Sequence, residues 1–241
     1  MKYMVAMCDI LGFSEFVQNN PLEGIVKASF EWLRKALYHC MYKNGFPNES
    51  VTLNQLLAHG RLGLAWFSDT ILIYTLEDTD ECINALASTL GWLLFETMLV
   101  PQVRLRCGVS YGEAYMDERN AMYVGKALIE AYQLQECQEW SGGALTPAAV
   151  QRIPREGQTG KFVYNWFLIP YKVPLTDGTN LETLAIDWTA GLHHPWNFQF
   201  AWSTANEEPT AKDWENHPDV CRKWQNTKAF HNSICRYCRS A

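Results

Sequence analysis

The stretch from Val5 to Ser14 constrains this chain more than any other, because an unbroken apolar run in it stops at a carboxylate. Such a run predicts a strand over residues 2–9 that is buried on both faces. Gly12 then predicts a turn, and Ser14 predicts the N-cap of a short helix. A carboxylate at a strand end, followed directly by a helix start, is typical of sites that hold a divalent metal beside phosphate groups.

A second aspartate, Asp69, follows about sixty residues after Asp9, between two β-rich runs over 61–67 and 70–76. These runs predict an antiparallel hairpin whose tight turn is Ser68-Asp69. In a split βαβ arrangement, the first strand and this hairpin lie side by side. We therefore expect Asp9 and Asp69 at the same end of neighbouring strands, within reach of a shared pair of metal ions.

The order of the remaining patterns predicts the fold class. They first indicate a helix opened by Pro21, a loop over 43–60 and a helix over 80–99. A strand over 103–111, which Gly112 breaks, is followed by a second arm over 113–124, a helix over 126–138 and short strands near 162–168 that complete the sheet. The order β-α-α-β-β-α-β-β-α predicts an α/β (α+β) fold. It is a ferredoxin-like split βαβ core with a mainly antiparallel sheet and helices.

The chain divides into a main domain over 1–175 and a tryptophan-rich extension over 176–241. Half of the ten tryptophans fall in the extension, at positions 188, 196, 202, 214 and 224. They could form a lobe that binds a ligand or a partner. Aromatic packing of the extension onto the core is the favoured interpretation.

Composition limits the setting of the protein. The formal net charge of −6 argues against nucleic-acid binding as the main task. Polar residues interrupt the longest apolar stretch, 83–101, which predicts a buried helix and not a membrane span. No secretory signal is visible, so we expect a cytoplasmic location. Most cysteines fall in apolar runs, which favours small core residues in a reducing compartment, and Cys235 and Cys238 form a weak candidate zinc pair.

The two aspartates fit a definite chemistry. A nucleoside triphosphate is highly charged, and two divalent ions relieve the repulsion that an attacking oxygen meets at the α-phosphorus. Asp9 and Asp69 would hold both ions, and the backbone carbonyl of Ile10 would add a third ligand. Because all of these ligands are oxygens, Mg²⁺ or Mn²⁺ is the expected metal.

Four segments, taken in order, resemble the motifs of class III nucleotidyl cyclases: residues 9–14, 67–70, 103–112 and 123–127. The resemblance spans residues 3–140. It implies an enzyme that makes a 3′,5′-cyclic nucleotide and pyrophosphate from a nucleoside triphosphate. It also implies two metal ions per site and a head-to-tail homodimer with active sites at the interface. From the net charge and the interrupted apolar stretch, we expect neither a nucleic acid nor a membrane as partner.

The resemblance also assigns roles to single residues. The matches are the metal ligands Asp9, Ile10 and Asp69, the phosphate-binding turn of Gly12, Phe13 and Ser14, and Arg106 as an arginine that neutralises phosphate charge. Arg106 has a plainer interpretation as well, that of a solvated arginine at a strand edge.

Some positions depart from the family pattern. Ala65 and Met122 occupy positions that read the base in purine cyclases, and neither side chain can discriminate bases by hydrogen bonding. A pocket narrowed by Trp66 or Tyr123 would suit a smaller base. With its Ser-Asp-Thr and Ser-Tyr-Gly-Glu variants, the chain resembles the bacterial Pycsar pyrimidine cyclases. This implies a UTP cyclase, or alternatively a CTP cyclase, whose product is a messenger for a separate effector in anti-phage defence.

Ile129 and Gln133 stand where many family members carry the asparagine and arginine that steady the transition state. Loss of such a donor typically costs about 10²–10³-fold in rate. Arg104, Lys126 or Tyr132 could substitute for it. Alternatively, the protein is an inactive pseudo-cyclase that binds a nucleotide and regulates a partner. A diguanylate-cyclase-like enzyme is a weaker alternative, because 67–70 lacks the Gly-Gly-Asp/Glu-Glu-Phe turn.

Overall fold

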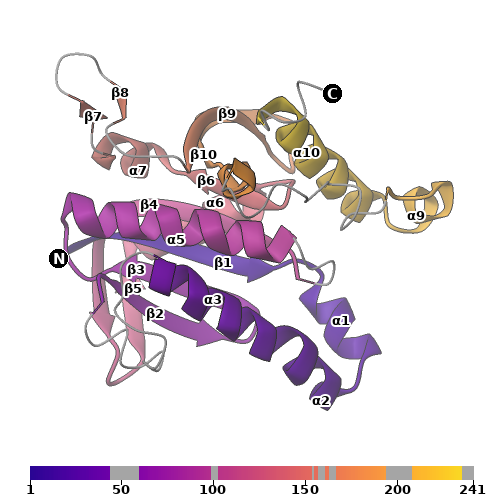
Figure 1. Cartoon of the computed structure of the whole chain (residues 1–241), viewed down its shortest axis with the longest axis horizontal. Coiled ribbons are helices and arrows are strands. Elements are labelled where there is room, and N and C mark those ends of the chain that lie inside the picture. Colours follow the sequence, from indigo (N-terminus) through magenta and orange to yellow (C-terminus); the bar gives the residue numbers. More distant parts are fainter. Residues whose placement is uncertain are drawn as a thin grey trace.

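A computed structural model describes residues 1–43, 60–98, 103–153, 155–156, 161–162, 167–193 and 208–234. Its centre is an eight-stranded sheet in the order β2-β3-β1-β4-β6-β10-β9, with β5 paired to β4 (Figure 1). The strands are β1 Lys2–Ile10, β2 Leu62–Phe67, β3 Thr70–Thr75, β4 Leu105–Asp117, β5 Met122–Gly125, β6 Gly142–Leu145, β9 Leu168–Pro174 and β10 Asn180–Ile186. A separate pair is formed by β7 Arg155–Glu156 and β8 Lys161–Phe162.

The strands of the large sheet are antiparallel to their neighbours except for β4 and β6, which are parallel. Within the sheet, the order β2-β3-β1-β4 is that of a split βαβ core. The predicted fold class is therefore confirmed: a mixed α/β fold with an open, mainly antiparallel sheet and helices.

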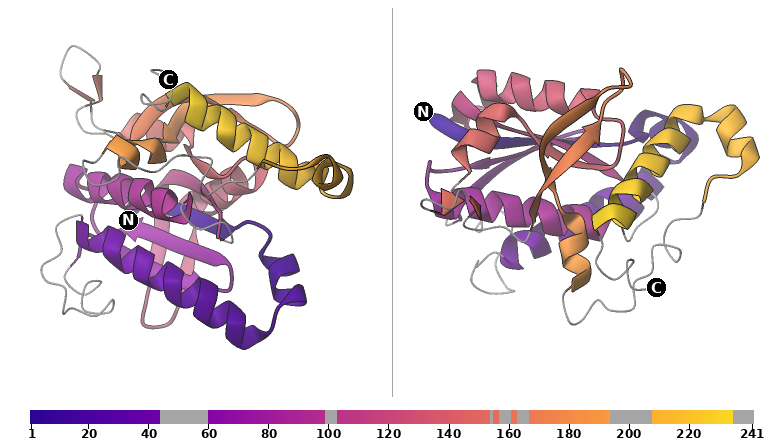
Figure 2. Two further views of the ribbon diagram at one scale, coloured as in Figure 1. Left: turned by 45° about the vertical axis from the view of Figure 1, so that its right-hand side comes forward. Right: turned by 90° about the horizontal axis from the view of Figure 1, so that it is seen from above.

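Helices cover both faces of the sheet. They are α1 Phe13–Asn19, α2 Leu22–Ile25, the π-helical η1 Val26–Phe30, α3 Glu31–Lys43, α5 Asp80–Met98, α6 Lys126–Cys137, α7 Pro147–Arg152, the 3₁₀ segment η3 Trp188–His193, α9 Ala211–Asn216 and α10 Pro218–Ile234. Seen from above, α6 lies on one side of the sheet and α5 on the other (Figure 2). Among the described residues, no helix is both long enough and apolar enough to cross a membrane.

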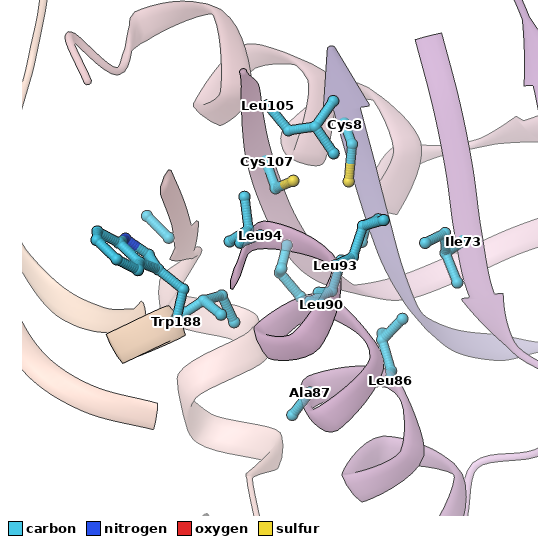
Figure 3. Close-up of a cluster of buried hydrophobic side chains, with 14 of the residues drawn as sticks. Cys8, Ile73, Leu86, Ala87, Leu90, Leu93, Leu94, Leu105, Cys107 and Trp188 are labelled. Carbon is cyan, nitrogen blue, oxygen red and sulfur yellow. The ribbon is translucent and has the colours of Figure 1, made fainter. Parts of the chain in front are cut away.

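Strand β1 separates two apolar clusters, because its side chains alternate between the two faces of the sheet. Cys8 and Ile10 belong to the larger cluster, which also contains residues of α5 and α3. Figure 3 shows Cys8 together with residues of α5 in this cluster. Val5 and Met7 belong to the smaller cluster beneath α6. The same alternation places the side chain of Asp9 on the α6 side. The candidate site built around Asp9 therefore lies on the face of the sheet that α6 covers.

The described cysteines are free thiols, and all are buried except Cys137, which is half-buried. Cys8 and Cys107 face each other across β1 and β4 in the larger cluster (Figure 3). This agrees with the prediction that most cysteines are core residues. Cys235 and Cys238 lie outside the described residues.

Helix α1 begins two residues earlier than the sequence predicts. Its N-cap is Gly12, not Ser14, and Gly12 adopts φ 75°, in the left-handed region that glycine tolerates best. Ser14 therefore lies within the first turn of the helix. The helix predicted after Pro21 is confirmed as the continuous run of α2, η1 and α3. Most of the predicted loop over 43–60 lies outside the described residues.

Two strand predictions are wrong. Gly112 does not end its strand, because β4 pairs with β1 up to Glu113 and with β5 from Ala114 onward. Pairing on both sides of the glycine outweighs its low strand preference. The sheet is also not completed near 162–168: β8 pairs with β7 alone, and β6, β10 and β9 complete the sheet.

The extension continues the core of the protein. Strand β10 lies between β6 and β9, so the sheet itself runs past residue 175. Trp188 is fully buried, and its ring stacks on that of His231 with centroids 5.6 Å apart. Phe230 of α10 packs against Trp140 at 4.8 Å. At these positions the aromatic residues of the extension pack onto the core, whereas positions 196 and 202 lie outside the described residues.

Gly108 allows α6 to lie directly on β4. A β-carbon at this position would meet the carbonyl oxygen of Ala131 and lie 2.6 Å from the backbone nitrogen of Gln135. We expect Gly108→Ala to lower the free energy of unfolding by about 1–3 kcal/mol, measured by urea denaturation. Gly24→Ala in α2 is the control, because open space surrounds its β-carbon. Equal stability of the two variants would contradict this close packing.

Candidate active site

Asp9 and Asp69 meet at one end of the sheet. Asp9 pairs with Thr70 across β1 and β3, and the N–H of Ile10 donates to the carbonyl oxygen of Asp69 at 3.2 Å. Ser68 precedes Asp69 in the hairpin turn at φ 55°. The carboxyl group of Asp69 lies close enough to that of Asp9 to raise its pKa. Two carboxyl groups and the backbone of Ile10 thus form one cluster.

The electrostatics of this cluster centre on Asp9. Burial raises the pKa of Asp9 to about 6, and the charges of Asp69 and Glu136 raise it as well, whereas the charge of Arg106 opposes the shift. Two carboxylates in contact repel each other when both are ionised. A cation beside the pair would remove this repulsion, so the pair is suited to binding one.

Arg106 lies opposite Asp9 in the register of β1 and β4, and it is 7% exposed. Its Nη1 donates to the carbonyl oxygens of Glu136 and Gln138 at 3.0 and 3.1 Å. Its Nη2 lies 3.0 Å from the carboxylate of Glu136 and 3.6 Å from that of Asp9. The interpretation of Arg106 as a solvated strand-edge residue is therefore wrong, because the guanidinium is held inside the protein by the end of α6.

Glu136 is a member of this cluster that the sequence analysis missed. It lies in the last turn of α6, and its side chain is 50% exposed. Besides Arg106, the Nε2 of Gln135 donates to it at 2.9 Å. From sequence alone, a glutamate at the end of a helix is interpreted as an ordinary solvent-exposed charge. Only its placement beside Arg106 in the folded protein reveals its role.

The turn that leads from β1 into α1 is fixed on one side by the entry to β4. The N–H of Leu11 donates to the carbonyl oxygen of Arg104 at 2.9 Å. The ring of Phe13 packs edge-on against that of Phe30, with centroids 5.6 Å apart. Ser14 is exposed. Of the residues expected to bind phosphate, Phe13 thus supports the turn from behind, and Ser14 faces solvent.

The residues expected around the base lie on different faces of the sheet. Ala65 and Tyr123 pack in the smaller cluster beneath α6, on the side of Asp9. Trp66 lies on the opposite side, where its ring stacks on Phe30 at 5.2 Å. Met122 is 47% exposed on β5. A base beside Ala65 and Tyr123 would therefore not contact Trp66.

Ile129 and Gln133, which stand where many class III cyclases carry an asparagine and an arginine, lie on the outer surface of α6. Ile129 is 58% exposed, and Gln133 is exposed as well. Among the possible substitutes, Tyr132 and Lys126 are exposed on the same helix. Arg104 is half-buried and donates to the carbonyl oxygen of Thr97 in α5 at 2.5 Å.

Helix α10 holds the segment that follows α6. The side-chain amide of Asn226 donates to the carbonyl oxygen of Glu139 at 2.6 Å. The N–H of Ser141 donates to Oγ1 of Thr227 at 2.8 Å. The same segment includes Gln138, whose carbonyl oxygen accepts from the buried arginine. The C-terminal extension is thus tied to the cluster through residues 138–141.

The donors at this strand end fit one class of metal. Within the described ranges, no three histidine, cysteine or acidic side chains form a group that could hold a metal ion. The available donors are the carboxylates of Asp9 and Asp69 and the backbone oxygen of Ile10. Mg²⁺ is usually bound by one or two carboxylates together with substrate phosphates. The residues present therefore fit a metal ion that a phosphate ligand helps to bind.

No protein-family model and no curated protein sequence matches this chain. Solved structures do match. The catalytic core of a rhodopsin-guanylyl cyclase with converted specificity, in complex with ATPαS, is 14% identical, covers 77% of this chain and 94% of its own, and has a TM-score of 0.52. The guanylyl cyclase domain of the RhoGC fusion protein from the aquatic fungus Blastocladiella emersonii is 10% identical, with coverages of 77% and 95% and a TM-score of 0.46.

An adenylate/guanylate cyclase/hydrolase from Silicibacter pomeroyi is 11% identical, with coverages of 77% and 95% and a TM-score of 0.44. The likeness to the rhodopsin-guanylyl cyclase core shows the fold of this chain, which is that of a nucleotide cyclase catalytic domain.

We expect Asn226→Ala to lower the free energy of unfolding by about 1–3 kcal/mol, because the carbonyl oxygen of buried Glu139 loses its donor. Urea denaturation measures the change. The matched control is Asn216→Ala at the exposed end of α9, which should change stability little. If both variants are equally stable, α10 does not hold the segment after α6.

Proposed function

We propose that this protein is a nucleotidyl cyclase that converts a nucleoside triphosphate into a 3′,5′-cyclic nucleotide and pyrophosphate. The observation that carries the proposal is the placement of Asp9 beside Asp69 at a strand end of a sheet that has the cyclase fold. The sequence motifs around both aspartates, which resemble those of class III cyclases, support the same activity.

In this proposal, Asp9, Asp69 and the carbonyl of Ile10 hold two Mg²⁺ or Mn²⁺ ions. When bound, the metal ions reduce charge repulsion at the α-phosphorus and activate the attacking ribose hydroxyl. Asp9 must be ionised to serve as a ligand. Arg106, at 3.6 Å from Asp9, favours that ionised form.

We propose two roles for Arg106. It positions Asp9, because Glu136 and two carbonyl groups at the end of α6 fix its guanidinium next to that carboxylate. Its positive charge also lies behind the strand end, where it would reduce the repulsion between the carboxylates and substrate phosphates. We propose that the turn of Gly12, Phe13 and Ser14, which is exposed at Gly12 and Ser14, binds those phosphates. This turn resembles the phosphate-binding turn of class III cyclases.

We further propose a pyrimidine substrate, with UTP favoured over CTP. Ala65 and Tyr123 lie on the side of Asp9, and neither Ala65 nor Met122 offers the paired donors and acceptors that purine selectivity requires. The resemblance to the Pycsar cyclases supports the same choice. On that resemblance alone, the product would act in the cytoplasm as an anti-phage messenger for a separate effector.

The surface of α6 and the β4–β5 hairpin supports a homodimer. Five large apolar side chains there are between 47% and 68% exposed: Tyr115, Met122, Val124, Ile129 and Tyr132. Tyr115, Met122 and Val124 alternate with residues that pack beneath α6, so they point to the opposite face of the hairpin, whereas Ile129 and Tyr132 lie on the outer surface of α6. Large exposed apolar side chains such as these are typical of an interface. Because α6 covers the face of Asp9, a partner bound to Ile129 and Tyr132 would border the site. The active sites would then lie at the dimer interface.

We expect Asp9→Asn and Asp69→Asn to abolish cyclic-nucleotide synthesis, with a loss of at least about 10³-fold, because each substitution removes a metal-binding charge. Purified protein is incubated with Mn²⁺ and each of the four triphosphates, and cyclic product and pyrophosphate are measured by chromatography and mass spectrometry. Asp219→Asn on α10 is the control, and thermal unfolding verifies the fold of each variant.

The same assay decides between an active cyclase and an inactive pseudo-cyclase. The pseudo-cyclase remains an alternative because Ile129 and Gln133 stand where many cyclases carry the asparagine and arginine that steady the transition state. Synthesis of a cyclic pyrimidine nucleotide by the wild-type protein supports the proposal. Tight nucleotide binding without pyrophosphate release would favour the regulator. Full synthesis in either aspartate variant would refute the metal assignment.

We expect Ile129→Glu to weaken self-association, because it places a charge within the apolar surface of α6. Sedimentation velocity at several protein concentrations measures the change. Leu22→Glu on α2 is the matched control, since Leu22 is 71% exposed and lies on a different face. A wild-type protein that stays monomeric at all concentrations, or an Ile129→Glu variant that associates normally, would contradict this interface.

A further inference from the structure

A cavity of about 220 Å³ lies between the turn after β1 and helix α10. Its described lining consists of Leu11, Gly12, Arg104, Ser141, Val220, Lys223, Trp224 and Thr227. The four residues from α10 recur at intervals of three and four, so they form one stripe of the helix. Figure 1 shows α1 and α10 at the same end of the molecule, the end towards which β1 runs.

The charged side chains in this lining are both cationic. Arg104 comes from the entry to β4 and Lys223 from α10, and the lining contains no carboxylate among the described residues. This is notable in a chain with 26 acidic and 20 basic residues. Burial lowers the pKa of Arg104 to about 10, which still leaves it protonated at neutral pH. The cavity therefore favours an anion.

The remaining walls are mainly apolar, and the hydroxyl groups of Ser141 and Thr227 are already engaged in hydrogen bonds within the protein. Leu11, Val220 and the ring of Trp224 supply the apolar surface. Thr227 accepts from the N–H of Ser141 and donates to a carbonyl oxygen of its own helix at 2.7 Å. An occupant therefore needs an apolar body as well as a negative charge. The cavity volume is below the ~300–1,000 Å³ usual for drug-sized ligands, so the occupant is small.

We propose that this cavity is a binding site for a small organic carboxylate with an apolar or aromatic body. The carboxylate would lie between Arg104 and Lys223, and the body would pack against Trp224, Val220 and Leu11. This site is separate from the carboxylate cluster, which lies on the α6 side. Its wall is nevertheless the turn that directly follows Ile10, so an occupant would contact the segment that leads out of the candidate active site.

Benzoate is the probe, and its dissociation constant is measured by ligand-observed NMR on the full chain, without metal or nucleotide. We expect Lys223→Met to weaken benzoate binding about tenfold, the effect of losing one hydrogen bond to a charged group. Lys212→Met on exposed α9 is the matched control and should bind as the wild type does. Trp224→Leu should also weaken binding, whereas Trp214→Leu on α9 should not.

Three results would overturn the proposal. These are equal affinity of the wild type and Lys223→Met for benzoate, equal affinity of the wild type for neutral benzamide and benzoate, and displacement of benzoate by inorganic pyrophosphate. The last result would assign the cavity to the phosphate end of a nucleotide instead. Because binding is measured without turnover, the outcome does not depend on whether the protein is a cyclase.

Discussion

The pairing of Asp9 with Arg106 across β1 and β4 is the interaction on which the rest of the site depends. Burial works against the ionised form of Asp9, and the guanidinium favours it. The arginine is itself buried, so it requires the carbonyl groups at the end of α6 and the charge of Glu136. The ionisation state of Asp9 therefore depends on the register of β1 with β4 and on the close packing of α6 on Gly108. We treat these elements as one structural unit.

Helix α10 extends this unit beyond the stretch whose motifs resemble cyclases. Through Asn226 and Thr227 it holds the segment after α6. The hydroxyl of Ser141 in that segment also donates to the carbonyl oxygen of Leu105, the neighbour of Arg106 on β4. The extension therefore supports the strand that carries the arginine through this segment. Removal of α10 would expose the part of the core that packs against Phe230, including Trp140. It would also loosen the carbonyl groups of Glu136 and Gln138 that hold the guanidinium of Arg106.

The sequence predicted the elements whose signals are local. The apolar run before Asp9 and the turn at Ser68-Asp69 indicate their structures without reference to distant residues. Strand pairing is non-local, and this is why Gly112 suggested a break that pairing with β1 and β5 prevents. Glu136 was missed for the same reason, because its importance comes from an arginine thirty residues away. Trp66 was grouped with Ala65 although neighbouring strand residues point to opposite faces.

The net charges on the two sides of the strand end have opposite signs. Towards α6, the carboxylates of Asp9, Asp69 and Glu136 outnumber the guanidinium of Arg106, whereas Arg104 and Lys223 line the cavity towards α10. The bond from the N–H of Leu11 to the carbonyl oxygen of Arg104 joins the two sides through a single turn. With a net charge of −6, the protein as a whole repels anions. A triphosphate would therefore bind best together with metal ions at the carboxylates, whereas an organic anion without a metal would require the cationic side.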